Sequence, residues 1–303
     1  MRPSVGPKIT IVVLSYNRPD LLRHALVSIA AQTEPNCEVI VVDNASPCSA
    51  KVRDVVSGFP EVCLIANAEN LGFTGGMNRG IRAAAGTYIY LTEDDIELDA
   101  NCVAALIAYL DQHEEAVLAG PVMWNRGTGT VRCAGGSFRL GTIYQMQVTG
   151  VGQSHIAEAS PYRTMYLPGA AIAARTDVLR RLGGFRSDFF MYGEDVELCA
   201  RTLERGGSVV IVPGARVYHH EPQNVPDSFR VRFHKQKNLV ALYLLHAPMR
   251  VLPGFLARYV VMDGIRRFAR DWSSLPAWTL GVSVALIRAP QFLAERVRRT
   301  CAT

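Results

Sequence analysis

The sequence predicts an α/β fold with a doubly wound, mostly parallel sheet and a helical extension at its C-terminal end. Runs of β-branched and apolar residues alternate with amphipathic helical segments along the first part of the chain, which is typical of such sheets. Strand patterns stop after Asn224, and the rest is helical in pattern and rich in arginine. The 303 residues are 49% apolar, which excludes a disordered chain.

The first half supplies the alternating elements. Proline suits a first helical turn, so a helix should begin at Pro19. Further helices are expected from residues 52–56, over 77–85 behind a glycine-rich loop, and over 101–112. Buried strands should occupy residues 9–15, 38–42, 62–66 and 87–92.

The second half has a weaker pattern. Strands are predicted over residues 116–121, 130–138, 165–174 and 209–212, and helices over 175–182 and from Asp195. Residues 144–162 lack periodicity, which indicates a loop over the site. We expect a nucleotide-binding half at 1–98, an acceptor and catalytic half at 99–224, and a helical extension at 225–303.

Charge separates the body from the extension. Residues 1–224 hold 19 basic and 23 acidic residues, whereas residues 225–303 hold 13 basic and 4 acidic ones. A uniformly basic nucleic-acid-binding domain is therefore excluded. The seven cysteines include no CxxC pair, which favours reduced thiols in the cytoplasm. We expect no signal peptide, and the longest charge-poor apolar stretch, 275–287, is shorter than a membrane span needs.

Polar clusters follow the predicted strands, where ligands bind in parallel sheets. Glu93, Asp94 and Asp95 follow one strand, and three adjacent carboxylates suit a divalent cation. They could equally cap a helix predicted to follow at Ile96. Asp43 could accept hydrogen bonds from a base or ribose, or form an Asx-turn.

Other segments suit a nucleotide. Tyr16, beside Asn17, could stack on a base or simply pack. The glycine-rich segment NLGFTGGMNRG could bring its backbone close to a phosphate, but it matches neither a P-loop nor GxGxxG. Its candidate donor-binding residues are Asn70, Gly72, Gly76 and Asn78.

A second acidic group, Glu194 and Asp195, opens a predicted helix. A carboxylate fixed there could act as a general base, or only cap the helix. His219 and His220 follow the last strand and could supply a metal ligand or a structural contact.

At these motifs the chain resembles family-2 nucleotide-sugar glycosyltransferases with a GT-A fold. The matching pieces, in family order over about residues 8–220, are VVLSYNRPDLLRHALVSIAAQT, EVIVVDNAS, NAENLGFTGGMNRGI, GTYIYLTEDDIEL, LPGAAIAARTDVLRRLGGF and FFMYGEDVELCARTLERGG. The nearest branch is rhamnosyltransferase-like and builds bacterial surface polysaccharides.

The resemblance implies residue roles. Tyr16 and Asp43 would hold the nucleobase and ribose, with Asn17 and Asp94 on the same side and the loop from Asn70 near the diphosphate. Glu93 and Asp95 match the ends of the DxD motif, with Glu in place of the usual first Asp, and Asp95 would contact Mg²⁺ or Mn²⁺. Asp195, with Glu194, matches the general base, and His219 a histidine sometimes found on the metal.

The resemblance also implies an inverting transfer from a UDP- or dTDP-sugar, such as dTDP-rhamnose, to a glycan or lipid-linked hydroxyl. One alternative is a nucleotidyltransferase, which needs a Gly-rich basic signature where SYNRPDLL stands. Another is a non-catalytic sugar- or membrane-binding module, which would be expected to lose acids at 95 or 195. The basic extension suits an anionic membrane surface at the inner face of the cell membrane, or a second subunit, better than nucleic acid.

Overall fold

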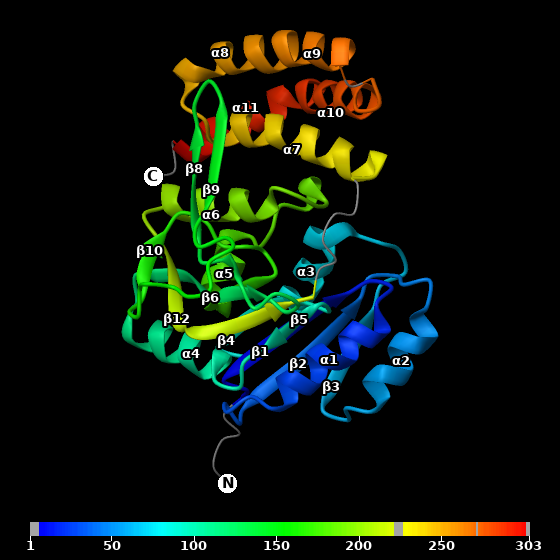
Figure 1. Ribbon diagram of the computed structural model, residues 1–303, viewed down its shortest axis with the longest axis vertical. Coiled ribbons are helices and arrows are strands. Elements are labelled where there is room, and N and C mark those ends of the chain that lie inside the picture. The colour runs from blue at the N-terminus through cyan, green and yellow to red at the C-terminus, as the bar shows by residue number, and fades with distance from the viewer. Residues whose placement is uncertain (1–5, 221–226, 271, 301–303) are drawn as a thin grey trace.

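The computed structural model describes residues 6–220, 227–270 and 272–300, with only the backbone of residues 270, 299 and 300. A long mixed sheet runs through the lower part of the molecule in Figure 1, and a stack of C-terminal helices lies at the opposite, upper end of the molecule. The sheet order is β10-β12-β6-β11-β4-β1-β2-β3, with β5 on β12, β7 on β6 and a separate β8–β9 hairpin.

The strands are β1 Ile9–Ser15, β2 Cys37–Asp43, β3 Val62–Ala66, β4 Tyr88–Glu93, β5 Ile96–Leu98, β6 Ala116–Asn125, β7 Val131–Cys133, β8 Gly136–Leu140, β9 Tyr144–Val148, β10 Tyr162–Thr164, β11 Ala171–Arg175 and β12 Ser208–His219. The helices are α1 Pro19–Ala30, α2 Ser49–Ser57, α3 Gly72–Ala83, α4 Cys102–Gln112, α5 Thr176–Leu182, α6 Glu194–Glu204, α7 Phe229–His246, α8 Leu252–Leu256, α9 Asp263–Arg270, α10 Leu275–Ile287 and α11 Ala289–Thr300.

Parallel pairing places the ends of neighbouring strands side by side. β1 pairs in parallel with β2 on one side and β4 on the other, with Ser15 opposite Asp43 and Leu14 opposite Glu93. Every residue of β1 is buried, as its continuous apolar run predicts for a central strand. The polar groups after β1, β2 and β4 therefore meet at one edge of the sheet, as expected.

Several predicted elements differ from the structure. α3 begins at Gly72, not at Met77, because glycines let it lie close to the sheet: a Cβ at Gly76 would come 2.4 Å from Leu14 Cδ1. The loop expected over 144–162 begins with strand β9 and ends where β10 starts, and the strand expected over 130–138 is divided into β7 and β8. β12 continues to His219, past the predicted end at residue 212.

The C-terminal helices build a second apolar core. Tyr243 of α7 stacks on Phe255 of α8, with ring centroids 3.5 Å apart, and Phe189 from the body joins the same cluster. The β8–β9 hairpin reaches up to these helices (Figure 1), where a Cβ on Gly254 would lie 3.0 Å from Thr142 Cγ2. The extension is thus packed onto the body.

The described segments contain no single helix long and apolar enough to cross a membrane. The helices α10 and α11 are together long and apolar enough for a span, but they are bent by 48° relative to each other. Six cysteines lie in the described residues, all as free thiols, and Cys301 lies outside them.

Candidate active site

The acidic triad follows β4, where its charges are concentrated. Asp94 and Asp95 are 2% and 4% exposed, and Glu93 is partly buried. The next element is the strand β5, not a helix, so the helix-capping alternative for this triad is wrong. Three carboxylates held in a partly dry position need compensating positive charge.

Arg18, directly before α1, supplies part of that charge. Its guanidinium forms an ion pair with Asp95 Oδ2, and its Nε lies 3.7 Å from Asp94 Oδ1. Asp94 Oδ2 also accepts hydrogen bonds from Ser15 Oγ at 2.9 Å and from the backbone N–H of Tyr16 at 3.0 Å. Asp94 therefore fixes the turn after β1 and is occupied within the fold.

Asp95 is the carboxylate best placed for a cation. His219 Nε2 lies 3.4 Å from Asp95 Oδ2, while His220 is turned toward Glu97. Asp95 Oδ1 is buried and has no hydrogen-bond partner within the described part of the chain. An unpaired buried carboxylate oxygen beside an imidazole fits a divalent cation such as Mg²⁺ or Mn²⁺.

The pKa values divide these acids into two kinds. Burial, together with repulsion from Asp95 and Asp94, raises the pKa of Glu93 to about 8. Burial raises the pKa of Asp94 to about 6 against the opposing charge of Arg18. Burial also acts to raise the pKa of Asp95, but contacts with His219 and Arg18 outweigh it and lower that pKa. Asp95 is therefore the one carboxylate of this triad whose pKa is lowered.

The second acidic pair opens α6 after a strained loop. Phe190 and Tyr192 adopt φ of 64° and 66°, and Gly193 follows with φ of 84°. Residues other than glycine rarely adopt such angles, and they tend to do so at functional sites. Asp195 lies in the first turn of α6, where Tyr166 donates a hydrogen bond of 2.8 Å to its Oδ2.

Burial shifts the pKa values of Glu194 and Asp195 in the same direction. Burial and the neighbouring Asp195 charge raise the pKa of Glu194 well above its usual value. Burial also raises the pKa of Asp195, but the hydrogen bond from Tyr166 opposes that shift. Because the charge of Glu93 contributes to the shift of Glu194, the two acidic groups lie within electrostatic reach of each other. The structure thus brings the two predicted acidic groups into one site.

Asn238 of α7 holds the strained loop in place. Its Nδ2 lies 2.7–2.8 Å from three carbonyl oxygens, those of Phe189, Met191 and Tyr192. The ring of Phe190 stacks on His234, with centroids 4.8 Å apart. The C-terminal extension therefore contributes directly to the loop that carries Glu194 and Asp195.

The predicted nucleotide residues lie around the ends of β1 and β2. Tyr16 is 43% exposed, so its ring is accessible to a base. Asn17 has φ of 60° and donates its backbone N–H to Ser46 Oγ at 2.9 Å. Asp43 is 1% exposed, and its Oδ1 accepts from the backbone N–H of Ser46, three residues on, at 3.0 Å, so it holds the turn after β2. A nucleotide contact by Asp43 stays a prediction.

The loop before α3 is held together by Asn44. Asn44 Oδ1 accepts from the backbone N–H of Leu71 at 3.0 Å, and its Nδ2 donates to the carbonyl of Gly72 at 3.0 Å. Asn70 Oδ1 accepts from the N–H of Gly72 at 2.8 Å. Gly72 has φ of 71°, and a Cβ there would approach Phe190 O to 2.4 Å. Gly72 thus lets the loop of the second acidic pair come close.

Asn78 has a different contact from the one predicted. Its Nδ2 donates to the carbonyl of Phe185 at 2.7 Å, and its Oδ1 accepts from the N–H of the same residue at 2.9 Å. Both ends of the amide are used within the fold. Gly76 similarly serves the packing of α3 on β1. We therefore leave Asn78 and Gly76 out of the proposed donor site.

Sequence patterns missed four residues that shape the site: Arg18, Asn44, Tyr166 and Asn238. Arg18 and Asn44 each follow a predicted strand that ends at the ligand-binding edge, so their position was a usable signal. Tyr166 and Asn238 reach the site only through tertiary packing, and no local pattern marks them.

Comparisons with known proteins agree with this arrangement. Residues 10–183 match the family model described as Glycosyl transferase family 2. The chain belongs to this family. The match covers more than half of the chain and includes the DxD-like triad and the glycine-rich loop.

Two curated relatives come from Mycobacterium tuberculosis. A pre-mycofactocin glycosyltransferase is 24% identical over 279 residues, which is 88% of this chain and 56% of that protein. An N-acetylglucosaminyl-diphospho-decaprenol L-rhamnosyltransferase is 26% identical, covering 74% of this chain and 81% of that protein. The chain spans little more than half the length of the first of these relatives.

Two solved structures share the fold. GalNAc-T7 with UDP, GalNAc and Mn²⁺ gives a TM-score of 0.64 at 16% identity, covering 80% of this chain and 48% of that one. The mannosyltransferase PcManGT from Pyrobaculum calidifontis, with GDP-Man and Mn²⁺, gives 0.58 at 20% identity, covering 99% and 82%. The predicted GT-A type fold, with helices at the C-terminal end, is confirmed.

Proposed function

We propose that this protein is an inverting, divalent-metal-dependent glycosyltransferase. It moves a sugar from a UDP- or dTDP-sugar, such as dTDP-rhamnose, to a hydroxyl of a glycan or lipid-linked acceptor in cell-surface polysaccharide synthesis. Membership of glycosyl transferase family 2 and relatives named as a glycosyltransferase and a rhamnosyltransferase support the donor class and the reaction. The same membership counts against a nucleotidyltransferase.

The observation that carries the proposal is the presence of two carboxylates in one site with different surroundings: Asp95 has a buried oxygen without a partner among the described residues, and Asp195 is held by Tyr166. The pKa of Asp95 is lowered, which suits an anion that holds a cation, and burial raises the pKa of Asp195, which suits a group that accepts a proton. An enzyme of this type needs one anion for the cation and another for the acceptor proton. A non-catalytic module has no need for both carboxylates.

Asp195 supplies the base. The acceptor O–H proton moves to Asp195 while the acceptor oxygen forms a bond to the anomeric carbon, and the bond from that carbon to the phosphate oxygen breaks. The electron pair of the broken bond leaves with the nucleoside diphosphate. Asp195 is only half-buried, so an acceptor hydroxyl can reach it, and Tyr166 orients its carboxylate through Oδ2. One base and one displacement give inversion.

Asp95 and His219 would hold Mg²⁺ or Mn²⁺, with Glu93 nearby. When bound, the cation neutralises charge that develops on the departing diphosphate. Asp95 has its buried Oδ1 available for this purpose. Tyr16 and Asn17 border the space in which the donor base would lie, at the ends of β1 and β2.

The test measures release of nucleoside diphosphate from a panel of UDP- and dTDP-sugars with Mg²⁺, Mn²⁺ or EDTA. Asp195→Asn keeps the shape of the side chain and should lower the rate by about 10²–10⁴-fold with little change in donor binding. Asp54→Asn, at an exposed position on α2, is the matched control for the loss of one acid. Unchanged turnover in EDTA would refute metal dependence, and full activity of Asp195→Asn would leave Asp195 as a helix cap.

The C-terminal helices supply a surface for the acceptor's membrane. Five large apolar side chains along the outer edge of the helical layer are 47–64% exposed, and we call them the outer apolar face: Val261, Met262, Ile265, Phe268 and Trp272. Figure 1 shows α8 and α9 as the outermost layer, at the end opposite β2 and β3. Arg266 lies on the same segment and is 59% exposed.

Apolar and basic residues together suit an anionic lipid surface. Residues 225–303 have a net charge of +9, so they complement such a surface at the inner face of the cell membrane. The occupant we propose is therefore the membrane that holds a lipid-linked acceptor. A second subunit is the competing occupant.

Co-sedimentation with anionic and neutral vesicles, at low and high salt, distinguishes the two. The double variant Ile265→Ser/Phe268→Ser should weaken binding to anionic vesicles. Val27→Ser, at a 57% exposed position on α1, is the matched control and should bind as the wild type does. Equal, negligible binding of the wild type to both kinds of vesicle would refute membrane contact and leave oligomerisation.

A further inference from the structure

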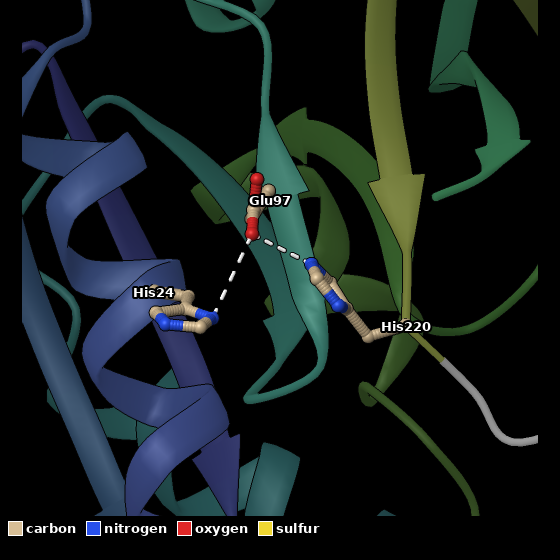
Figure 2. A group of neighbouring side chains, drawn as sticks. All are labelled: His24, Glu97 and His220. Atoms are coloured by element: carbon tan, nitrogen blue, oxygen red, sulfur yellow. Dashed lines mark hydrogen bonds and ion pairs between the residues drawn. The ribbon is translucent and has the colours of Figure 1, made fainter. Parts of the chain in front are cut away.

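A second group of metal-ligating side chains lies next to the proposed active site. Figure 2 shows His24, Glu97 and His220 converging from α1, β5 and the end of β12. One ligand atom from each lies within 4.8 Å of the others. Glu97 Oε1 is 2.6 Å from His220 Nε2 and 3.9 Å from His24 Nδ1.

The backbone beneath these side chains is firmly held. Glu97 lies opposite Tyr218 in the antiparallel pairing of β5 with β12, and the N–H of His220 donates to the carbonyl of Asp95 at 2.9 Å. Ser28 of α1 accepts the N–H of Leu98 at 3.0 Å, which ties the helix to the strand. The three ligands therefore project from fixed positions, as a metal site requires.

The spacing is close to that of a bound ion. Ligands about 2.0 Å from a tetrahedral ion lie about 3.3 Å apart, between the 2.6 Å and 3.9 Å found here. Small side-chain rotations are enough to bring the ligand atoms to the spacing of a tetrahedral site. Arg126 Nε lies 3.2 Å from Glu97 Oε2, so that oxygen is engaged and Oε1 is left for an ion.

We propose that His24, Glu97 and His220 bind a borderline first-row divalent cation, with Zn²⁺ as the best match. Two imidazoles and one carboxylate suit Zn²⁺, whereas Mg²⁺ and Mn²⁺ prefer oxygen ligands such as Asp95. His220 would bind the ion through Nε2 and Glu97 through Oε1, the two atoms that already face each other at 2.6 Å. His24 is 57% exposed, so the fourth position is open to water.

Such an ion would join α1 to the end of β12, beside but separate from the Asp95 site. Its role is to fix the two elements that border the acidic triad. This inference is independent of the proposed glycosyltransferase activity, because it concerns binding alone.

The experiment is a calorimetric titration of the full chain with Zn²⁺ in saturating Mg²⁺, repeated in an Asp95→Ala background. His24→Ala should bind one Zn²⁺ fewer than the wild type, or bind it with an affinity at least about tenfold lower. Even the loss of a residue that only contacts a metal ligand lowers metal affinity by about that factor. The control is His113→Ala, because His113 is also an exposed histidine paired with a carboxylate, Glu115, at 3.3 Å. It should bind as the wild type does.

Two results would overturn the proposal. One is Zn²⁺ binding by His24→Ala with the stoichiometry and affinity of the wild type. The other is the absence of Zn²⁺ binding by the wild type at concentrations comparable to the protein. Loss of the fold does not obscure the test, because His24 is exposed on a helix where alanine is favourable, and circular dichroism checks it.

Discussion

Asn238→Ala tests whether the C-terminal helices shape the active site. Asn238 is 2% exposed, and its Nδ2 lies within hydrogen-bond distance of three carbonyls of the strained loop. An amide nitrogen has only two N–H groups, so one of them is shared. The variant removes both donors and leaves the carbonyls behind.

The size of the effect follows from what each carbonyl keeps. Phe189 O also accepts the N–H of Met191 at 2.8 Å, so it retains a donor. Met191 O and Tyr192 O lose the contact with Asn238. Each buried carbonyl left unpaired lowers the free energy of unfolding by about 1–2 kcal/mol. A loss of about 2–4 kcal/mol corresponds to a fall in Tm of about 3–6 °C for a chain of this size.

Activity should fall more than stability alone predicts. Asp195 lies three residues after Tyr192, the last residue whose carbonyl Asn238 contacts. A displacement of about 1 Å at a reacting group can lower the rate by about 10²-fold. We expect kcat to fall by about 10–100-fold, well below the variant's Tm, with the donor KM little changed. The assay is nucleoside diphosphate release, with Asn36→Ala, at an exposed position, as the matched control.

A clear result would refute this reasoning. If Asn238→Ala melts at a lower temperature but keeps kcat within twofold of the wild type, α7 supports only the fold. If Asn36→Ala loses as much activity, the effect is not specific to the strained loop.

Three further predictions concern single side chains. Asp95→Ala should abolish transfer and leave the circular dichroism spectrum unchanged, because it removes the carboxylate proposed to hold the cation; activity equal to wild type would contradict that role. Tyr166→Phe removes the hydrogen bond that lowers the pKa of Asp195, so the acid limb of the kcat–pH profile should move to higher pH; an unmoved limb would show that Asp195 is not the group titrating. Burial lowers the pKa of His246, but contacts with Glu197 and Glu204 outweigh it and raise that pKa above the unfolded value. The stability His246 adds is therefore present below about pH 6.5 and lost as pH rises through its folded pKa, so the Tm difference between wild type and His246→Gln should be largest in mild acid and shrink in alkali.

The predictable part of the fold was the part with strong periodicity. β3 has the predicted bounds, and β1 is the buried run that was expected. The glycine-rich segment misled because glycine is a weak helix former, yet here its small size lets α3 lie against β1. Packing decided that segment, and local propensity did not.

The acidic site was predictable because parallel strands bring their ends together. Once residues 87–92 were placed in a parallel sheet, Glu93–Asp95 had to lie near the ends of the neighbouring strands. Whether those acids capped a helix depended on the element that follows them in the chain. That element, β5, has three residues, which is too short for the hydrophobic pattern to distinguish a strand from a helix. The predicted roles of Asp43, Asn70 and Gly72 toward a nucleotide stay predictions.

The position of α7 connects the two proposals made for the C-terminal region. One side of this helix holds the loop before Asp195 through Asn238, and the other packs against α10, where a Cβ on Gly281 would lie 2.8 Å from Phe233 O. The helix α9, which carries Ile265 and Phe268 of the outer apolar face, lies beyond α10 in the helical layer (Figure 1). Because tightly packed helices shift as units and not side chain by side chain, a membrane in contact with the outer apolar face would act on the same layer that holds the loop before the proposed base, Asp195. Anionic vesicles should therefore raise kcat for donor hydrolysis by the wild type, and Ile265→Ser/Phe268→Ser should lose that increase while keeping its activity without vesicles. An equal increase in both proteins would show that lipid acts elsewhere.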